Sequence, residues 1–354
     1  MPKKHATITS RKRQHVEITL SRDVSFRDRA AGFEQWEFVH NALPELNVAE
    51  IDPKTLFLAK EISFPLIVSS MTGGYPEALR INRQLAEVCA EKRLAMGVGS
   101  QRQALGDSSY HRTFSVVREV APGIPVFGNL GAAEVATLND ATPVLRLLEM
   151  IDADGFAVHL NPLQEYLQPE GNPEFRGVLR GIAMLVRALP VPVMVKEIGA
   201  GISADVARRL VDAGVRIIDV AGAGGTSWAG VEILRRNVGK RSRQQSSDAG
   251  EVFWDWGIPT ADALRQVAAL RQDVSDLKIV GSGGIHDGLA MAKAIAMGAD
   301  AVGAARVFLK ALHTGGRKEL AQVIDRWKYQ FLGAMFLTGS RTVHDLQTQV
   351  LLRR

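Results

Sequence analysis

The sequence predicts an α/β fold, namely a closed (β/α)8 or TIM barrel with a basic N-terminal extension and a long loop after the sixth strand. Two observations carry this prediction. Short apolar and β-branched runs alternate with stretches of helical periodicity. Eight such units follow one another in about 250 residues, the usual length of a closed barrel, so an open doubly wound sheet is the weaker alternative.

The expected elements follow in order along the chain. Strands are expected at residues 66–69, 95–99, 126–129, 156–160, 193–196, 217–221, 278–282 and 301–304, and connecting helices at 77–92, 143–150, 204–213, 260–271 and 288–297. Residues 314–354 are expected to form closing helices around an apolar run. Because no Pro- or Ser-rich linker divides the chain, we expect a single domain over residues 1–354, with 1–50 as the N-terminal extension.

The connection after the sixth strand is much longer than the others. Its excess lies in residues 225–257, which are polar and basic in the middle and end in Phe253, Trp254 and Trp256. Such a segment suits a mobile lid over the barrel mouth. The alternatives are a surface excursion or a contact between subunits.

The composition excludes several classes of protein. With 46% hydrophobic and 23% charged residues, the chain can bury a large core and is not globally disordered. A single cysteine, Cys89, excludes an internal disulfide framework and a CxxC metal site, and it fits a reducing compartment. No apolar run approaches the roughly 20 residues of a spanning helix and no secretory signal is evident, so we expect a cytoplasmic protein without a membrane partner.

The net charge of +5 is concentrated at the N-terminus, because residues 1–30 hold eight basic and three acidic side chains. A body-wide basic face that binds nucleic acid is therefore not expected. Within this segment Arg11, Lys12 and Arg13 precede His15. A solvated basic tail is one interpretation. The other is a pyrophosphate clamp that folds over the site of its own or a neighbouring subunit.

Two turns of small residues predict a phosphate site. One lies within residues 280–288, at the end of the seventh strand, and the other within 298–306, at the eighth. Their small residues let backbone amides approach a ligand closely, and the helix N-termini that follow favour an anion. A single Gly-Gly pair would be weak evidence, because tight turns between strand and helix require glycine anyway.

Polar residues also end several other expected strands, where barrel enzymes keep their catalytic groups. Singly, Ser100 or Thr226 is compatible with a helix cap, and His159 with a histidine on the barrel rim. A lysine pointing into a barrel mouth is costly unless it meets an anion. Lys196 therefore indicates a Schiff base, a phosphate contact or a stabiliser of cofactor charge, and an ion pair to Glu197 or another neighbour is the structural alternative.

The segment after the fourth strand predicts a magnesium site. It brings together His159, the amides of Asn161 and Gln164, and the carboxylate of Glu165. One carboxylate beside amides suits Mg²⁺, which completes its shell with water and substrate phosphate, and does not suit zinc. The alternative is that Glu165 only stabilises the start of a helix.

Taken together, these residues resemble the type 2 isopentenyl-diphosphate isomerases, a family of FMN-dependent (β/α)8 enzymes. The resemblance covers nearly the whole chain. It depends on residues 11, 12 and 15, 71–74, 99–102, 128–131, 159–162 with 164 and 165, 195–197, 223–228 and 282–285. Each motif is common alone, but the ordered set is specific. The resemblance implies that reduced FMN and Mg²⁺ convert isopentenyl diphosphate to dimethylallyl diphosphate by moving a double bond, without net oxidation.

The resemblance also implies a role for each matching residue. FMN contacts would come from Met71, Thr72, Gly73, Ser100, Asn129, Lys196, Thr226, Gly283, Gly284, Ala304 and Ala305. The diphosphate or the isoprenyl chain would be bound by Arg11, Lys12, Ser100, Gln101, Arg102 and Gln164. The implied catalytic residues are His159, Gln164 and Lys196, and Glu165 is the implied Mg²⁺ ligand. NADPH as the flavin reductant and a homo-oligomer, a tetramer or an octamer, are further expectations.

Three other functions fit the sequence less well. A flavin-dependent 2-hydroxy-acid oxidase needs a His-Gly-Gly-Arg stretch after the sixth strand, where residues 221–226 supply neither His nor Arg. A nucleotide dehydrogenase of this barrel type needs a loop cysteine, whereas Cys89 lies in an expected helix. A protein that only stores flavin needs no second anion site such as the basic N-terminal triplet.

Overall fold

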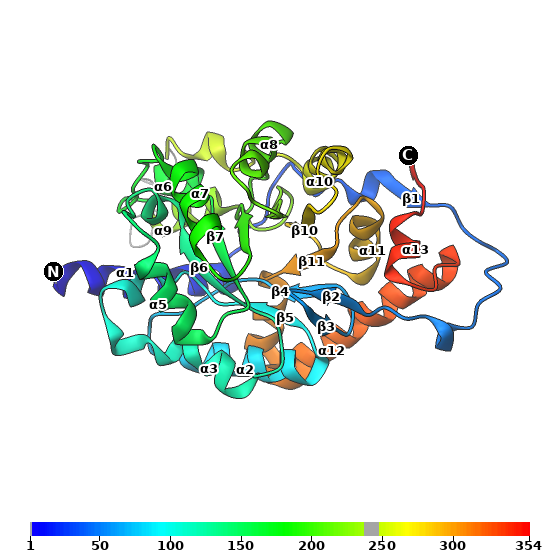
Figure 1. The fold of residues 1–354 in the computed structure, drawn as a ribbon, viewed down its shortest axis with the longest axis horizontal. Coiled ribbons are helices and arrows are strands. Elements are labelled where there is room, and N and C mark those ends of the chain that lie inside the picture. The colour runs from blue at the N-terminus through cyan, green and yellow to red at the C-terminus, as the bar shows by residue number, and fades with distance from the viewer. Residues whose placement is uncertain (1, 237–247) are drawn as a thin grey trace.

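The computed structural model describes residues 2–236 and 248–354 and confirms the predicted barrel. Eight parallel strands close in chain order (Figure 1): β4 Leu66–Val68, β5 Ala95–Gly97, β6 Val126–Gly131, β7 Gly155–His159, β8 Val193–Lys196, β9 Ile217–Asp219, β10 Lys278–Ser282 and β11 Ala301–Ala304. The strand ends differ from the expected ones by two residues at most.

A helix follows each barrel strand and covers its outside (Figure 1). These helices are α2 Ala78–Lys92, α3 Arg112–Val120, α5 Thr142–Ile151, α7 Val178–Ala188, α8 Ala204–Asp212, α10 Thr260–Ala268, α11 Gly288–Ala296 and α12 Arg306–Thr338. Their apolar residues pack against the strands in one buried cluster, which includes Leu85, Leu185 and Leu264. Cys89 of α2 belongs to this cluster, and burial raises the pKa of its thiol, so it is a core residue. Within residues 2–236 and 248–354, no helix is both long and apolar enough to cross a membrane.

The inside of the barrel is packed and closed at the N-terminal ends of the strands. A separate buried cluster takes one residue from each strand: Ile67, Ala95, Phe127, Ala157, Met194, Ile217, Val280 and Ala301. The hairpin of β2 (Thr55–Phe57) and β3 (Lys60–Ile62) adds Phe57, whose ring centroid lies 5.7 Å from that of Phe127. Because one end is sealed in this way, ligands must enter at the C-terminal end of the strands.

The N-terminal extension is folded. It forms helix α1 (Pro2–Ser21), which contacts α9 (Trp228–Arg236) and α12. The guanidinium of Arg306, at the start of α12, donates to the carbonyl oxygens of Thr19 (3.2 Å) and Arg22 (3.1 Å) and so fixes the end of α1 to the barrel. The interpretation of this segment as a solvated tail is therefore wrong.

The long connection after β9 carries structure on both sides of residues 237–247, which lie outside the described residues and hold the middle of the expected lid. α9 precedes them, and the 3-10 turn η6 (Glu251–Phe253) follows them. Trp254 is buried, and its Nε1 donates to the carbonyl oxygen of Ser25 (2.9 Å), whereas Trp256 is exposed. The described part of the connection thus packs against the N-terminal segment, and its movement as a lid stays a prediction.

The C-terminal segment differs from the expectation of helices alone. α12 begins earlier than expected, bends at Gly315 and Gly316, and is followed by α13 (Val343–Gln347). The last residues form a strand, β12 (Leu351–Arg353), which pairs antiparallel with β1 (Trp36–Phe38). A three-residue strand is too short for its periodicity to be recognised, so only the pairing with a distant segment reveals it.

The contact between α11 and α12 provides a test of the packing. A Cβ atom added to Gly288 would lie 2.1 Å from the carbonyl oxygen of Trp327, so one of the two helices must shift. We expect Gly288→Ala to lower the free energy of unfolding by about 1–3 kcal/mol, measured by chemical denaturation. Gly333→Ala in α12 is the matched control, because no described atom lies within 4 Å of the added Cβ. The control should gain about 0.5–1 kcal/mol, and equal effects of the two substitutions would contradict the packing argument.

Candidate active site

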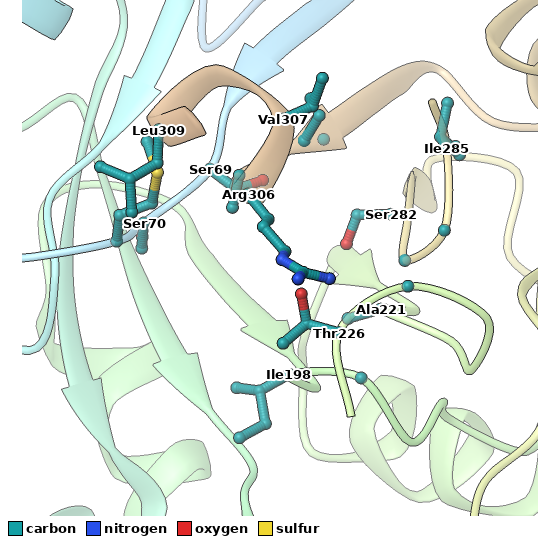
Figure 2. A pocket seen from close by; sticks show the side chains of 18 of the residues that line it. Ser69, Ser70, Ile198, Ala221, Thr226, Ser282, Ile285, Arg306, Val307 and Leu309 are labelled. Carbon is teal, nitrogen blue, oxygen red and sulfur yellow. The ribbon is translucent and has the colours of Figure 1, made fainter. Parts of the chain in front are cut away.

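A cavity of about 190 Å³ lies at the C-terminal end of the barrel (Figure 2). It is lined by seven of the residues predicted from the sequence: Met71, Lys196, Thr226, Gly283, Gly284, Ala304 and Ala305. Helix α1 contributes His15, Val16 and Thr19. The N-terminal helix therefore forms one wall of a site whose other walls come from the barrel loops.

The loops after β9 and β10 approach each other so closely that only glycine fits. Gly283 and Gly284 have φ values of 99° and 66°, in the left-handed region. A Cβ atom on Gly283 would lie 2.1 Å from the carbonyl oxygen of Gly222, and one on Gly225 would lie 2.5 Å from the amide nitrogen of Gly284. The loops therefore present backbone to the cavity, which is the arrangement in which amides bind an anion.

The N-terminus of α12 faces the same cavity. Arg306 and Val307 line it, and the side chain of the preceding Ala305 provides no cap. Amides in a first helical turn have no carbonyl partner within the helix, and the helix dipole makes this end positive. Figure 2 shows the Arg306 side chain extending from this turn into the cavity. Together with the turn at Gly283 and Gly284, the start of α12 forms a cradle that suits a phosphate group.

Lys196 ends β8 at the cavity. Its Nζ donates to the backbone oxygen of Glu197 (2.5 Å) and lies 3.9 Å from Oδ2 of Asp219, at the end of β9. The carboxylate of Glu197 instead accepts hydrogen bonds from the amides of residues 198–200, so the predicted alternative of an ion pair holds for the neighbouring Asp219 and not for Glu197. Burial raises the pKa of Glu197 to about 7.

Helix α1 brings cations to the rim of the barrel. The Nζ of Lys12 donates to the carbonyl oxygens of Gly73 (2.8 Å) and Ser100 (2.6 Å). Burial, followed by the charges of Arg11 and Arg102, lowers the pKa of Lys12 to about 7. Burial and Arg102 also lower the pKa of Arg11, whose Nε has no hydrogen-bond partner among the described residues. These cations repel one another, so an anion that joins them is strongly favoured.

His159 ends β7 beside these cations. Burial, followed by the charge of Lys196, lowers its pKa to about 3, so the imidazole is neutral. Its Nδ1 donates to Oδ1 of Asn129 (2.8 Å), which can only accept. Gln101 accepts from the amide nitrogen of Asn129 (2.8 Å) and donates to the carbonyl oxygen of Leu147 (3.1 Å). Gln101 is thus fully buried behind Asn129, and the structure gives it a supporting position.

Glu165 is buried in α6 (Pro162–Leu167) and held by amide groups. Its Oε1 accepts from Nδ2 of Asn161 (3.0 Å), and its Oε2 accepts from Nε2 of Gln168 (2.6 Å) and the amide of Asn172 (2.6 Å). The amide oxygens of Asn161 and Gln168 are buried without a hydrogen-bond partner in the described part of the chain. Two unsatisfied oxygens beside a carboxylate fit a hydrated Mg²⁺. In that same part, no group of three or more His, Cys, Asp and Glu side chains could hold a metal ion by itself.

Helix α9 supplies a buried carboxylate that the sequence analysis missed. Oε1 of Glu232 accepts from Nε2 of His15 (2.8 Å) and Nε2 of Gln164 (3.1 Å), and Oε2 accepts from Nε of Arg235 (2.8 Å). Burial opposes ionisation, but the hydrogen bond and charge of His15, followed by Arg235, lower the pKa of Glu232 to about 2. The available signal was an acidic residue inside the apolar run 229–234.

Two further carboxylates were also missed. Glu134, in α4 (Ala132–Val135), lies 2.7 Å from Nε of Arg102, and burial raises its pKa. Asp219 accepts from Oγ of Ser282 (2.6 Å), and burial raises its pKa as well. Asp219 gave a signal, since it is a charged residue inside an expected buried strand, whereas Glu134 gave none.

Four predicted FMN contacts are not among the residues that line the cavity: Thr72, Gly73, Ser100 and Asn129. Thr72 is buried, and its Oγ1 donates to the hydroxyl oxygen of Tyr75 (3.1 Å). Gly73 and Ser100 offer their carbonyl oxygens to Lys12. Gly73 and Ser100 thus bind the Lys12 cation of α1.

Comparison with known proteins identifies the relatives of this chain. A family model described as FMN-dependent dehydrogenase matches residues 158–353, more than half of the chain. The isopentenyl-diphosphate delta-isomerase of Pelodictyon phaeoclathratiforme is 46% identical over 98% of this chain and 97% of its own. The enzyme of that name from Chlorobaculum parvum is 46% identical over 100% of both chains. That from Pseudescherichia vulneris is 44% identical over 97% of this chain and 96% of its own.

Solved structures show the same fold at low identity. A lactate oxidase of Pediococcus acidilactici has a TM-score of 0.66 and 15% identity, covering 99% of this chain and 94% of its own. A mandelate oxidase has a TM-score of 0.63 and 17% identity, covering 92% and 90%. At such identities the likeness shows the barrel alone. The near-full-length relatives decide the family, and the chain belongs to the type 2, FMN-dependent isopentenyl-diphosphate delta-isomerases.

Proposed function

We propose that the enzyme converts isopentenyl diphosphate to dimethylallyl diphosphate with reduced FMN and Mg²⁺ and without net oxidation. One observation carries the proposal, namely two anion sites in one barrel mouth. The first is the cradle of Gly283, Gly284 and the start of α12. The second is the group of Arg11, Lys12 and Arg102. A flavin-storage protein needs only the first.

The cavity residues fit FMN. The cradle would hold its phosphate, and Met71, Lys196 and Thr226 would contact the ring system. When bound in its reduced form, FMN supplies an electron-rich anionic ring that can give and accept a proton. Lys196 places a cation beside that charge and stabilises it. Helix α1 lines the cavity through His15 and Val16 and would help to exclude water from it.

The second anion site would take the diphosphate. Arg11, Lys12 and Arg102 would bind its oxygens, and the anion would relieve their mutual repulsion. Glu165, with the unsatisfied amide oxygens of Asn161 and Gln168, would hold Mg²⁺ and its water shell. The metal would neutralise the remaining charge of the diphosphate.

A double-bond shift adds a proton at one carbon and removes one from another. Gln164 is linked through Glu232 to His15, so an imidazole lies two hydrogen bonds from the amide that would face the isoprenyl chain. The His15 ring centroid lies 5.3 Å from that of Trp228 in an edge arrangement. The aromatic face of Trp228 would stabilise positive charge that develops on the substrate.

An anaerobic assay tests the proposed function. Purified enzyme is supplied with isopentenyl diphosphate, FMN and Mg²⁺, without reductant, with dithionite or with NADPH, and dimethylallyl diphosphate is followed. We expect product only with reduced FMN and its loss after addition of EDTA. FMN binding without product would shift the function to an oxidase or a binding protein. Activity with NADPH alone as reductant would support NADPH as the physiological donor.

The role of the α1 cations predicts a KM effect. Arg11→Ala should raise the KM for isopentenyl diphosphate about 30-fold or more, because losing a charge-assisted contact in a desolvated site costs about 2–5 kcal/mol. Steady-state kinetics with reduced FMN measure this effect. Arg13→Ala is the matched control on the same helix, because Arg13 is exposed and pairs with Glu77 at the surface (2.5 Å). A comparable rise in the control would argue against a diphosphate site at Arg11.

Lys12 predicts a pH dependence of binding. With a pKa of about 7 in the free enzyme, Lys12 is charged below that pH and loses its charge above it. Because the diphosphate favours the charged form, KM should rise as the pH increases through 7. Lys12→Arg keeps its charge over this range, so its KM should change only with the titration of the substrate. Parallel KM profiles for the two enzymes would contradict the assignment.

Glu165 predicts a metal effect. Glu165→Gln should raise the Mg²⁺ concentration that gives half-maximal activity at least about tenfold, because an amide replaces the carboxylate ligand. Magnesium titrations of the reduced enzyme at saturating substrate measure this concentration. Glu174→Gln, a substitution at an exposed position outside α6, serves as the control and should leave the titration unchanged. A normal titration curve for Glu165→Gln would place the metal elsewhere.

A further inference from the structure

A buried carboxylate beside the cavity takes no part in the substrate or metal contacts proposed above. Asp219, the last residue of β9, is 2% exposed and is not among the residues that line the cavity. Its Oδ1 accepts from Oγ of Ser282 on β10 (2.6 Å) and from the amide of Ala221 (3.2 Å), while its Oδ2 lies 3.9 Å from Nζ of Lys196 on β8. Because β8, β9 and β10 are neighbours in the barrel, Asp219 links two side chains that do line the cavity.

In the described structure, the acidic group that pairs with Lys196 is Asp219. Glu197 is next in sequence, but its carboxylate is bound to the amides of residues 198–200. His159 is neutral and adds no charge. The charge at this part of the cavity therefore depends on the pair of Lys196 and Asp219. A buried lysine with a nearby carboxylate exerts a much weaker field than a lysine alone.

We propose that Asp219 is a positioning residue that sets the reduction potential of bound FMN by partly compensating the charge of Lys196. The inference rests on the proposed function, because it takes FMN as the ligand of the cavity. On reduction, the ring system of FMN gains two electrons and one proton and so becomes an anion. An uncompensated Lys196 would favour that anion strongly, and Asp219 moderates this preference. Asp219 also holds Lys196 in place through charge and holds Ser282 through a hydrogen bond.

Potentiometric titration of the FMN-loaded enzyme tests this inference. Asp219→Asn removes the charge but keeps the shape. We expect reduced FMN to bind at least about tenfold more tightly relative to oxidised FMN, which corresponds to a rise of about 30 mV for a two-electron couple. A change of less than about twofold, or a lower potential, would overturn the inference. The titration uses dithionite and reporter dyes, so its result does not depend on turnover.

A double-mutant cycle separates action through Lys196 from a direct effect. In a Lys196→Met background Asp219 has no counter-ion and takes up a proton, because burial already raises its pKa. In that background, Asp219→Asn should change the affinity of reduced FMN relative to oxidised FMN by less than about twofold, so the potential should hardly change. A shift as large as in the lysine-containing enzyme would overturn the assigned route. Asp154→Asn, at the opposite end of the barrel beside Lys60, is the control for loss of one carboxylate and should leave the potential unchanged.

A second variant keeps the inference testable where Asp219→Asn fails to fold or bind FMN. Ser282→Ala removes a hydrogen-bond donor that helps to keep the buried Asp219 ionised, so Asp219 compensates the charge of Lys196 less and the potential should rise, as in Asp219→Asn. A fall would contradict the inference. If the potentials change as expected but isopentenyl diphosphate is not converted, the proposed function alone is refuted. If the enzyme turns over but the potentials do not change, this inference alone is refuted. If the wild-type enzyme does not bind FMN, both are refuted.

Discussion

Parallel closure of eight short strands is the constraint on which the site depends. Because all strands run in one direction, Asn129, His159, Lys196, Asp219 and Ser282 come from five neighbouring strands to one rim. The register pairs His159 with Lys196 and Lys196 with Asp219. The contacts of His159 with Asn129, of Lys196 with Asp219 and of Asp219 with Ser282 all run sideways between adjacent strands. A change in register would break this row as well as the core beneath it.

Helix α1 completes the site with charge that the barrel does not supply. Three separate contacts fix it over the mouth. Arg306 binds the carbonyl oxygen of Thr19 near its end, His15 binds Glu232 on α9, and Lys12 binds carbonyl oxygens of the barrel loops. These contacts offset the cost of bringing Arg11 close to Arg102. The helix therefore both covers the cavity and makes the adjacent site attractive to an anion.

The sequence predicted what depends on local pattern and missed what depends on partners. The strands were found because each apolar run ends in small or polar residues, and Lys196 and His159 were found as polar residues at such ends. Glu232 and Asp219 escaped because burial of a carboxylate is decided by cations on other elements, His15 in one case and Lys196 in the other. The resemblance implies a substrate contact for Gln101, and the structure adds that this side chain is buried and accepts from the amide of Asn129, a contact with another strand that a motif does not reveal.

The site of Lys196 and the site of Arg11 and Lys12 differ in how their positive charge is compensated. This difference distinguishes a resident cofactor from a substrate that binds and leaves. Lys196 has a backbone carbonyl and Asp219 beside it, so its pocket is stable with or without a ligand. Arg11 and Lys12 keep lowered pKa values, and the Nε of Arg11 has no hydrogen-bond partner among the described residues, so their pocket gains most when an anion arrives. The repulsion between these cations increases the affinity for an anion that carries more than one charge, and it returns when that anion leaves. A site whose cation is compensated from within suits FMN, and a site whose cations keep lowered pKa values suits a diphosphate that must bind and depart in every turnover.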